Sequence, residues 1–477
     1  MTHRPLYAKK NHPIRIFIIL ICILCGIWYL TPRFNPQNIN EQSSLKNRTF
    51  AGKPNEIAAP KSGLKAYFLA ENSNPIIAVN FVFEGAGSIS DPKNLRGLAN
   101  LTAQMMTEGA GDLNSRSFKE ELENYAIEIS YGADLDNFSG QMLTTKDNLP
   151  RAIKMLRSTL LSPRLEQKDL YRLQQQTISA IERMQENPST QLQQKNSQIV
   201  FADHPYATPT IGIKNEVAKI TSADIRNFIN NQLSQDNLFI GIAGDLTTDE
   251  AEKIIDDVFS DIPQKNNILA IKVPNIDYSI GRTNIAKDTP QVLTQITTEG
   301  VSRQSKEFYP LYIANYIFGG SGLNSRLNQA AREKEGLTYG ASTYLVLLNQ
   351  SPLLSGQFST TPQNFVRMQQ IFDEEWKKMG EKGVSQQELD AAKNYLISSF
   401  NLRFSDISTI AEILAQMQKE KLGIDFLQKR NDYIKNVNLE QINLAAQRYF
   451  IPEKLIITNY GTTQTGEEKH EKDHKQN

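Results

Sequence analysis

A chain of 477 residues is too long for one hydrophobic core and long enough for two or three domains. Lysine plus arginine and aspartate plus glutamate number 52 each, so there is no global basic field and nucleic acid is not expected as a partner. Both cysteines, Cys22 and Cys25, lie in an N-terminal apolar run, which excludes disulfides and cysteine-ligated metals from the remainder.

The N-terminus has the pattern of an export signal. Residues 1–15 form a basic flank, and residues 16–30 are continuously apolar. That run is short for a relaxed spanning helix, which needs about 20 residues, and no A-x-A cleavage site follows it. It predicts an uncleaved signal anchor, with cleavage as the alternative and a buried core helix as a poorer fit. We therefore expect an exported body, anchored in a bacterial-type inner membrane and facing the periplasm, or periplasmic if the signal is cleaved.

Residues 31–62 are polar and rich in proline and asparagine, which is typical of a linker. Residues 63–262 then alternate between strand-like and helix-like patterns. Strands are predicted at 66–69, 76–83, 127–131, 138–143 and 238–243. Helices are predicted at 95–108, 117–125, 149–161, 166–186, 225–231 and 250–259, with another before Phe201.

The same order recurs in residues 289–460, after a linker at 263–288. Strands are predicted there at 292–298, 337–346, 354–358 and 455–460, and helices at 308–318, 365–379, 386–400 and 439–450. Both 76–83 and 292–298 are strands that run into Glu-Gly. The duplication predicts an α+β fold of two homologous domains, each an antiparallel sheet covered by helices. Residues 461–477 predict a disordered charged tail.

Residues 319–340 (GGSGLNSRLNQAAREKEGLTYG) predict a glycine turn, a helix and a strand. The predicted cap is Ser321 or Asn324, and the predicted apolar stripe is Leu323, Leu327 and Ala330 or Ala331. Gly336 ends the helix, and 337–347 reads as a strand. The glycines at 319, 320 and 322 lack the context of a phosphate-binding loop, so they predict a turn.

Two side chains in this stretch are candidates for function. Arg332 falls on the last helical turn and Tyr339 just inside the strand, so the guanidinium and the phenol could face the same space. The alternative is that Arg332 pairs with a nearby glutamate and Tyr339 is an ordinary strand aromatic.

With these features, residues 64–460 resemble the inverted zinc peptidases of the pitrilysin, insulin-degrading enzyme and mitochondrial processing peptidase family. The family's second-domain motif is intact in REKEGLTY, which keeps Arg332, Gly336, Leu337 and Tyr339. Residues 97–111, 181–188 and 201–212 are also similar to family sequences.

The zinc motif of that family, H-x-x-E-H, is absent. Its positions hold Asn100, Ala103 and Gln104, and the distal glutamate position falls on Ala180 or on Ser179 beside it. Asparagine and glutamine are weak neutral ligands, and alanine neither ligates nor accepts a proton, so the resemblance implies no metal in this chain.

The histidines lead to the same expectation. His204 is the only one of five between the apolar run and the tail, and it matches a family HPY turn, which favours a structural role. His470 and His474 lie in the charged tail, where no shell would orient them on a metal.

The resemblance therefore implies a half-clamshell, non-catalytic subunit of a heterodimeric zinc metallopeptidase. A homologous partner would carry H-x-x-E-H and the zinc, while Arg332 and Tyr339 would contact an extended peptide substrate and its transition state. One alternative is an interaction or scaffold protein of the same fold. Another is an autonomous zinc endopeptidase, which the missing ligands argue against.

Overall fold

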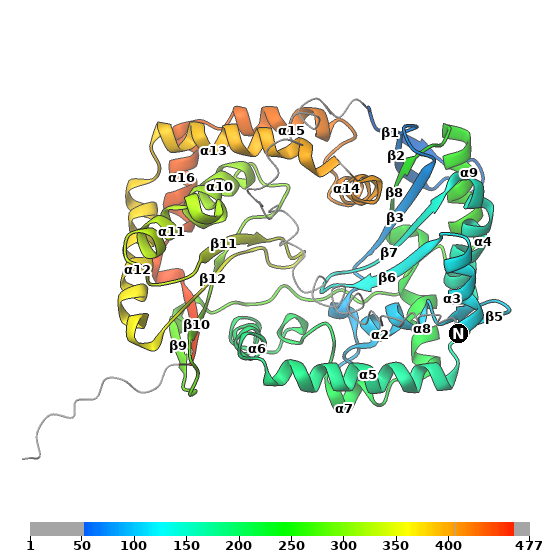
Figure 1. The fold of residues 1–477 in the computed structure, drawn as a ribbon, viewed down its shortest axis with the longest axis horizontal. Coiled ribbons are helices and arrows are strands. Elements are labelled where there is room, and N and C mark those ends of the chain that lie inside the picture. Colours follow the sequence, from blue (N-terminus) through cyan, green and yellow to red (C-terminus); the bar gives the residue numbers. More distant parts are fainter. Residues whose placement is uncertain (1–51, 405, 462–477) are drawn as a thin grey trace, which may run out of the picture. The chain divides into compact units, whose positions relative to one another are not determined.

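The computed structural model describes residues 52–404 and 406–461, which fold around two β-sheets, one from each half of the chain (Figure 1). In spatial order, the first sheet contains β1 (Asn55–Ala58), β2 (Lys65–Ala70), β8 (Leu238–Gly244), β3 (Ile76–Glu84), β7 (Asn137–Thr145) and β6 (Glu128–Ala133). The second contains β11 (Ala341–Val346), β12 (Leu353–Thr360), β10 (Val292–Glu299), β13 (Ile456–Tyr460) and β9 (Arg282–Ile285). A two-stranded hairpin, β4 (Gly109–Ala110) and β5 (Leu113–Asn114), stands apart. The predicted basic flank, the signal anchor and all but the first residue of the tail lie outside the described residues.

The two sheets have the same topology. The order β2-β8-β3-β7-β6 corresponds strand for strand to β9-β13-β10-β12-β11. In each sheet one pair is parallel, β2 with β8 and β9 with β13, and the other neighbours are antiparallel. This confirms the prediction of two homologous α+β domains.

Two strands lie in segments predicted as linkers. β1 falls in the predicted linker 31–62 yet pairs along its length with β2. β9 falls in the predicted linker 263–288 and closes the edge of the second sheet against β13. The boundaries therefore differ from those predicted: β1 forms a local pair with β2, whereas β9 finds its partner far along the chain.

The helices follow the predicted order with three additions. In the first half they are α2 (Leu98–Met105), α3 (Ser115–Asn124), α4 (Leu149–Leu161), α5 (Gln167–Glu186), α6 (Pro188–Phe201), α7 (Lys214–Val217), α8 (Ser222–Gln232) and α9 (Thr248–Phe259). In the second half they are α10 (Phe308–Asn315), α11 (Arg326–Asn328), α12 (Phe365–Lys382), α13 (Gln386–Ser398), α14 (Ile407–Lys419), α15 (Phe426–Lys435) and α16 (Leu439–Tyr449). The patterns used above identified none of α7, α14 and α15. Among the described residues, no helix is both long and apolar enough to cross a membrane.

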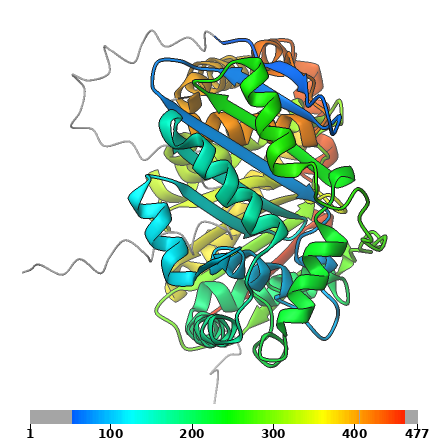
Figure 2. The same cartoon turned by 90° about the vertical axis from the view of Figure 1, so that its right-hand side faces the viewer.

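Each sheet is covered on both faces. Along β2, Ala66 and Phe68 point into the core shared with the helices of the first half, whereas Tyr67 and Leu69 point into a second core. Strand geometry sends successive side chains to opposite faces, so this unbroken apolar run requires two covers. Figure 2 shows helices of the first half lying over one face of the sheet.

The second cover of each sheet comes from the other half of the chain. α14 packs on β2, β3 and β8, and its Gln418 accepts a hydrogen bond from Ile240 N at 2.7 Å and donates one to Lys65 O at 2.9 Å (Figure 1). Conversely, α6 packs on β10 and β13, where Asn196 bonds the hydroxyls of Thr297 at 3.1 Å and Thr458 at 3.0 Å. The halves thus exchange one helix each.

Candidate functional site

The helical stretch before the REKEGLTY motif consists of three short pieces. A 3-10 turn spans Gly322–Asn324, α11 follows, and a π-helix spans Gln329–Glu333. The cap is Ser325, whose hydroxyl accepts from Asn328 N at 3.3 Å, so the prediction of Ser321 or Asn324 is wrong. The apolar stripe is confirmed at Leu327 and Ala331, but Leu323 is 51% exposed because it belongs to the 3-10 turn.

The helical stretch ends as predicted at Gly336, where φ is +65°. Gly336 N donates to Arg332 O at 3.0 Å, and Leu337 N donates to Ala331 O at 2.9 Å. The next strand begins only at Ala341, so the prediction that Tyr339 lies inside a strand is wrong. The segment between Gly336 and Ala341 is bonded to the helix end and to side chains instead of continuing the ladder.

Arg332 and Tyr339 do lie together. The Arg332 Nη1 atom donates a hydrogen bond to the backbone oxygen of Tyr339 at 2.7 Å. The Tyr339 side chain is 82% exposed, and Arg332 is exposed as well. Within residues 52–404 and 406–461, Arg332 has no ion pair; the neighbouring Glu335 binds Arg367 instead. The predicted alternative of an Arg332–glutamate pair is therefore not observed in this part of the chain.

The degenerate zinc motif lies on α2, in the first half. This helix begins after Gly97, whose φ of +104° and close approach to Ile211 O leave no room for a side chain. The Asp91 carboxylate accepts from Gly97 N at 2.7 Å and Ala99 N at 2.9 Å, supplying the cap that Gly97 lacks. Burial raises the pKa of Asp91 to about 7, although these backbone donors favour its charged form.

The four motif positions do not fit a zinc ion. Asn100 and Gln104 are half-buried on α2, with Ala103 buried between them, and α2 packs against α5, which carries a half-buried Ala180. Ser179, the other register, is exposed. Two neutral amides and two methyl groups provide no anionic or imidazole ligand. Across the described residues, no group of three His, Cys, Asp or Glu side chains is arranged to hold a metal.

His204 has a structural environment. Its Nδ1 atom accepts from Tyr206 N at 3.2 Å, so Nε2 carries the proton and donates to Lys272 O at 3.0 Å. Burial lowers the pKa of His204, although the bond to Lys272 opposes this shift. Both ring nitrogens are occupied, and the ring ties the first half to the segment that leads into the second.

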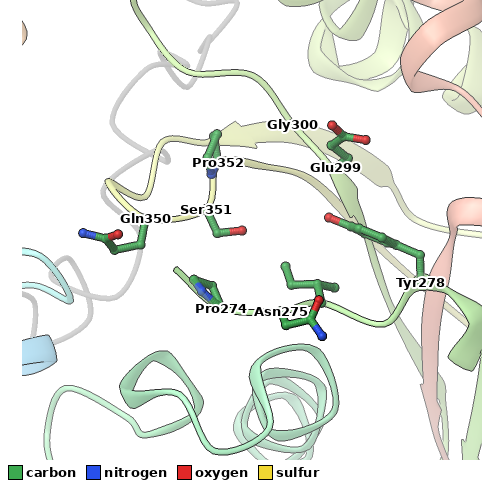
Figure 3. Close-up of a pocket in the computed structure, with 9 residues that line it drawn as sticks. Pro274, Asn275, Tyr278, Glu299, Gly300, Gln350, Ser351 and Pro352 are labelled. Carbon is green, nitrogen blue, oxygen red and sulfur yellow. The ribbon is translucent and has the colours of Figure 1, made fainter. Parts of the chain in front are cut away.

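One surface cavity of about 380 Å³ lies beside the second sheet (Figure 3). Tyr278 and Glu299 lie at one end and Gln350 at the other. Burial, and to a smaller extent the Glu299 charge, raise the pKa of Tyr278 to about 12. None of the predicted site residues lines this cavity, so it is a feature separate from the candidate site.

The candidate site thus falls into two groups. The structure brings Arg332 together with Tyr339 in the second half, and places the four motif positions on α2 and α5 in the first. Sequence reasoning missed the buried Asn328 and the remote cap Asp91. Asn328 gave a usable signal, because an asparagine that adjoins Leu327 and lies one turn from Ala331 on a predicted helix needs buried hydrogen-bond partners.

Family models match both halves of the chain. The insulinase model (peptidase family M16) matches residues 68–214, and the peptidase M16 inactive-domain model matches residues 219–396.

Similar proteins include a non-peptidase homolog, YmxG, of Helicobacter pylori. It is 26% identical over 372 residues, which cover 77% of this chain and 85% of that protein. An uncharacterized zinc protease, YmxG, of Bacillus subtilis is 19% identical over 373 residues, covering 77% and 89%.

Two solved structures share the fold. A peptidase M16 inactive domain from Pseudomonas fluorescens has a TM-score of 0.81 at 22% identity, covering 87% of this chain and all of that one. A protease from Helicobacter pylori has a TM-score of 0.75 at 16% identity, covering 86% and 99%.

Proposed function

Because this chain belongs to the insulinase family of peptidases (M16), we propose that it is a non-catalytic subunit that completes the active site of a zinc-bearing partner. A non-peptidase homolog and an inactive domain among its relatives support a non-catalytic protein. The observation that carries the proposed role beside a zinc-bearing partner is that this chain has lost the zinc motif and kept the Arg332–Tyr339 motif. The metal-binding positions are occupied by amides and methyl groups, whereas Arg332 and Tyr339 keep exposed side chains on a hydrogen-bonded backbone.

The chemistry divides between the two chains. The partner is a homologous subunit with H-x-x-E-H, which supplies the zinc and the general base. In this chain, the Tyr339 hydroxyl donates to the substrate carbonyl or to the oxyanion that develops from it. Arg332 uses one nitrogen for the Tyr339 backbone, and its remaining N–H groups bind a substrate carbonyl or carboxylate.

The substrate in this proposal is an extended peptide. Both sheets end in an edge strand on the corresponding side, β6 in the first and β11 in the second. On β11, the side chains of Asn328 and Asn315 already bind Ala341 N, Ala341 O and Thr343 O. An edge strand presents unpaired backbone groups that an extended peptide can match. β11 follows directly after the Arg332–Tyr339 segment, so a peptide that reaches this end of the second sheet would pass close to both side chains.

We further propose an exported location. Residues 1–30 have the pattern of a signal anchor, which would hold the body on the periplasmic side of an inner membrane, or release it after cleavage. These residues lie outside the described part of the chain. Fractionation of cells expressing the full chain, with the protein's size compared before and after export, tests this.

The deciding experiment measures zinc content and peptidase activity of the body alone and then with its co-purifying partner. We expect a metal-free, inactive lone chain and an active pair. If no homologous partner restores activity, the result favours the alternative of an interaction or scaffold protein with no peptidase role. If the lone chain holds one zinc and cleaves peptides, the assignment of Asn100, Ala103, Gln104 and Ala180 to the zinc motif is wrong.

A further inference from the structure

The segment that carries Arg332 and Tyr339 combines exposed side chains with an extensively bonded backbone. Leu337 O accepts from the Thr360 hydroxyl at 2.5 Å, and the Thr338 hydroxyl donates to Ser359 O at 2.7 Å. The same Thr338 oxygen accepts from Gly340 N at 3.0 Å. The middle of the segment is therefore attached to β12, although Arg332 and Tyr339 themselves point to solvent.

The two ends of the segment are joined by one buried side chain. Asn328 is 2% exposed and uses all of its amide. Its Oδ1 atom accepts from Ala341 N at 2.9 Å, and its Nδ2 atom donates to Ala341 O at 2.7 Å. Nδ2 also donates to Gly322 O at 2.8 Å. Asn328 therefore ties α11, just before the segment, to the first residue of β11, just after it.

The helix itself has an independent anchor. Arg326 binds both carboxylate oxygens of Glu388, at 2.6 and 2.7 Å, and this pairing lowers the pKa of Glu388 to about 2. α11 is thus fixed to α13 without Asn328. Removing the Asn328 amide would release Ala341, the first residue of β11, from α11. The start of α11 would stay in place, because Arg326 still binds Glu388.

We propose that Asn328 is a positioning residue, which sets the placement of Arg332 and Tyr339 by clamping both ends of the segment that carries them. The role it would serve rests on the proposed function of those two side chains. A bidentate amide is suited to this task, because it binds both the backbone N–H and the backbone C=O of Ala341 and so fixes the orientation of that residue's backbone as well as its distance. Catalytic groups need such support, since a shift of about 1 Å can cost about 100-fold in rate.

The first test compares Asn328→Ala with Asn237→Ala in the lone chain. Asn237 is a matched control in the first half: it is 7% exposed, donates to Glu84 O at 2.9 Å and Gln232 O at 3.0 Å, and accepts from Ser234 N at 3.2 Å. We expect amide hydrogen exchange across residues 333–341 to rise about 10- to 100-fold in Asn328→Ala only, from the loss of several buried hydrogen bonds. Trypsin cleavage after Arg332 and Lys334 should rise in parallel.

The second test is a conditional rescue with Asn328→Asp. Above its pKa the carboxylate has no donor and meets Ala341 O and Gly322 O, so the segment should exchange as in the alanine variant. Below its pKa the protonated acid has one donor and one acceptor, which restores the pair with Ala341. We expect amide exchange across residues 333–341 of Asn328→Asp, corrected for intrinsic pH dependence, to return toward the wild-type value as pH falls. Asn237→Ala should show no such change.

Some outcomes would overturn the inference. Unchanged exchange in Asn328→Ala, or a rise spread evenly over the whole chain, shows that Asn328 does not clamp this segment. Turnover of the assembled pair then separates this inference from the proposed function. A loosened segment with lower kcat and little change in KM supports both. A loosened segment with unchanged kcat supports the clamp and contradicts the role of Arg332 and Tyr339.

Discussion

The Arg332 guanidinium is bound to the backbone oxygen of Tyr339, not to its ring or hydroxyl. The two side chains are therefore held together by a contact that leaves the phenol free. A substitution that removes only the Tyr339 hydroxyl keeps the Arg332 bond, so the hydroxyl can be tested without disturbing its neighbour.

We expect Tyr339→Phe to lower kcat of the assembled pair by about 100- to 1,000-fold, the cost of one oxyanion donor, or about 3–4 kcal/mol. Assembly, followed by size-exclusion chromatography, should not change, because the Tyr339 side chain is 82% exposed. Tyr171→Phe is the control, since Tyr171 is 62% exposed on α5 in the other half and should leave kcat unchanged. Equal turnover of Tyr339→Phe and wild type would contradict the oxyanion role.

A zinc site can be rebuilt if the motif positions are assigned correctly. The triple variant Asn100→His, Gln104→His and Ala180→Glu places two imidazoles one turn apart on α2 and a carboxylate on α5, against which α2 packs. We expect one zinc per chain by elemental analysis after desalting, compared with none in wild type.

Two controls test the register of that site. Replacing Ala180→Glu by Ser179→Glu should abolish tight binding, because Ser179 is exposed on α5. The exposed pair Gln175→His and Ser179→His on α5 should retain no zinc, since two imidazoles without a third ligand bind weakly. Stronger binding with Ser179→Glu would move the register by one residue.

A buried carboxylate at the junction of the halves predicts a pH dependence. Asp136 accepts from the Tyr206 hydroxyl and, at 2.9 Å, from Asn349 N in the second half. Burial raises its pKa to about 6; the Tyr206 and Asn349 bonds and the Lys419 charge oppose this shift, and the Asp134 charge reinforces it. Because the folded pKa lies above the unfolded value of about 3.9, the contribution of Asp136 is full below about pH 4 and is lost as pH rises through 6.

Urea unfolding between pH 4 and 8 measures this dependence. We expect the Asp136 contribution to the free energy of unfolding to fall by at most about 3 kcal/mol over that range. Asp136→Asn does not titrate, so its stability curve should lack this component. The difference between the wild-type and Asp136→Asn curves should therefore fall as pH rises through 6. Parallel curves for wild type and Asp136→Asn would show that the carboxylate does not titrate in the folded protein near pH 6.

The exchange of helices between the halves makes one glycine sensitive to substitution. A Cβ atom at Gly241, on β8, would lie 2.0 Å from Ala411 O and 2.5 Å from Ala415 N of α14. We expect Gly241→Ala to destabilise the protein by about 1–3 kcal/mol or more, because the helix must move off the sheet. Gly340→Ala is the control, since its Cβ would meet no atom within 4 Å. Equal denaturant midpoints would show that α14 does not pack there in solution.

Local patterns predicted most of the strands and helices and the duplication, because these depend on periodicity and on caps. They failed where distant residues decide the structure. α14 was overlooked although Ile410, Leu414 and Met417 repeat at helical spacing; what the sequence could not show is that this stripe covers the sheet of the other half. The strand at Leu337 was predicted from its residue types, whereas the Leu337 carbonyl is bound to the side chain of Thr360. Within the site, the pairing of Arg332 and Tyr339 was predictable from their spacing, but its dependence on a backbone oxygen was not.

The exchanged helices also impose an order on synthesis. Every strand of the first sheet, up to Gly244, leaves the ribosome well before Ile407, where α14 begins. The apolar face formed by Tyr67, Leu69 and Ala78 therefore has no native cover while most of the second half is being made. A nascent chain in this condition needs a chaperone or a delay in folding, and any chain truncated before Ile407 would expose that face permanently.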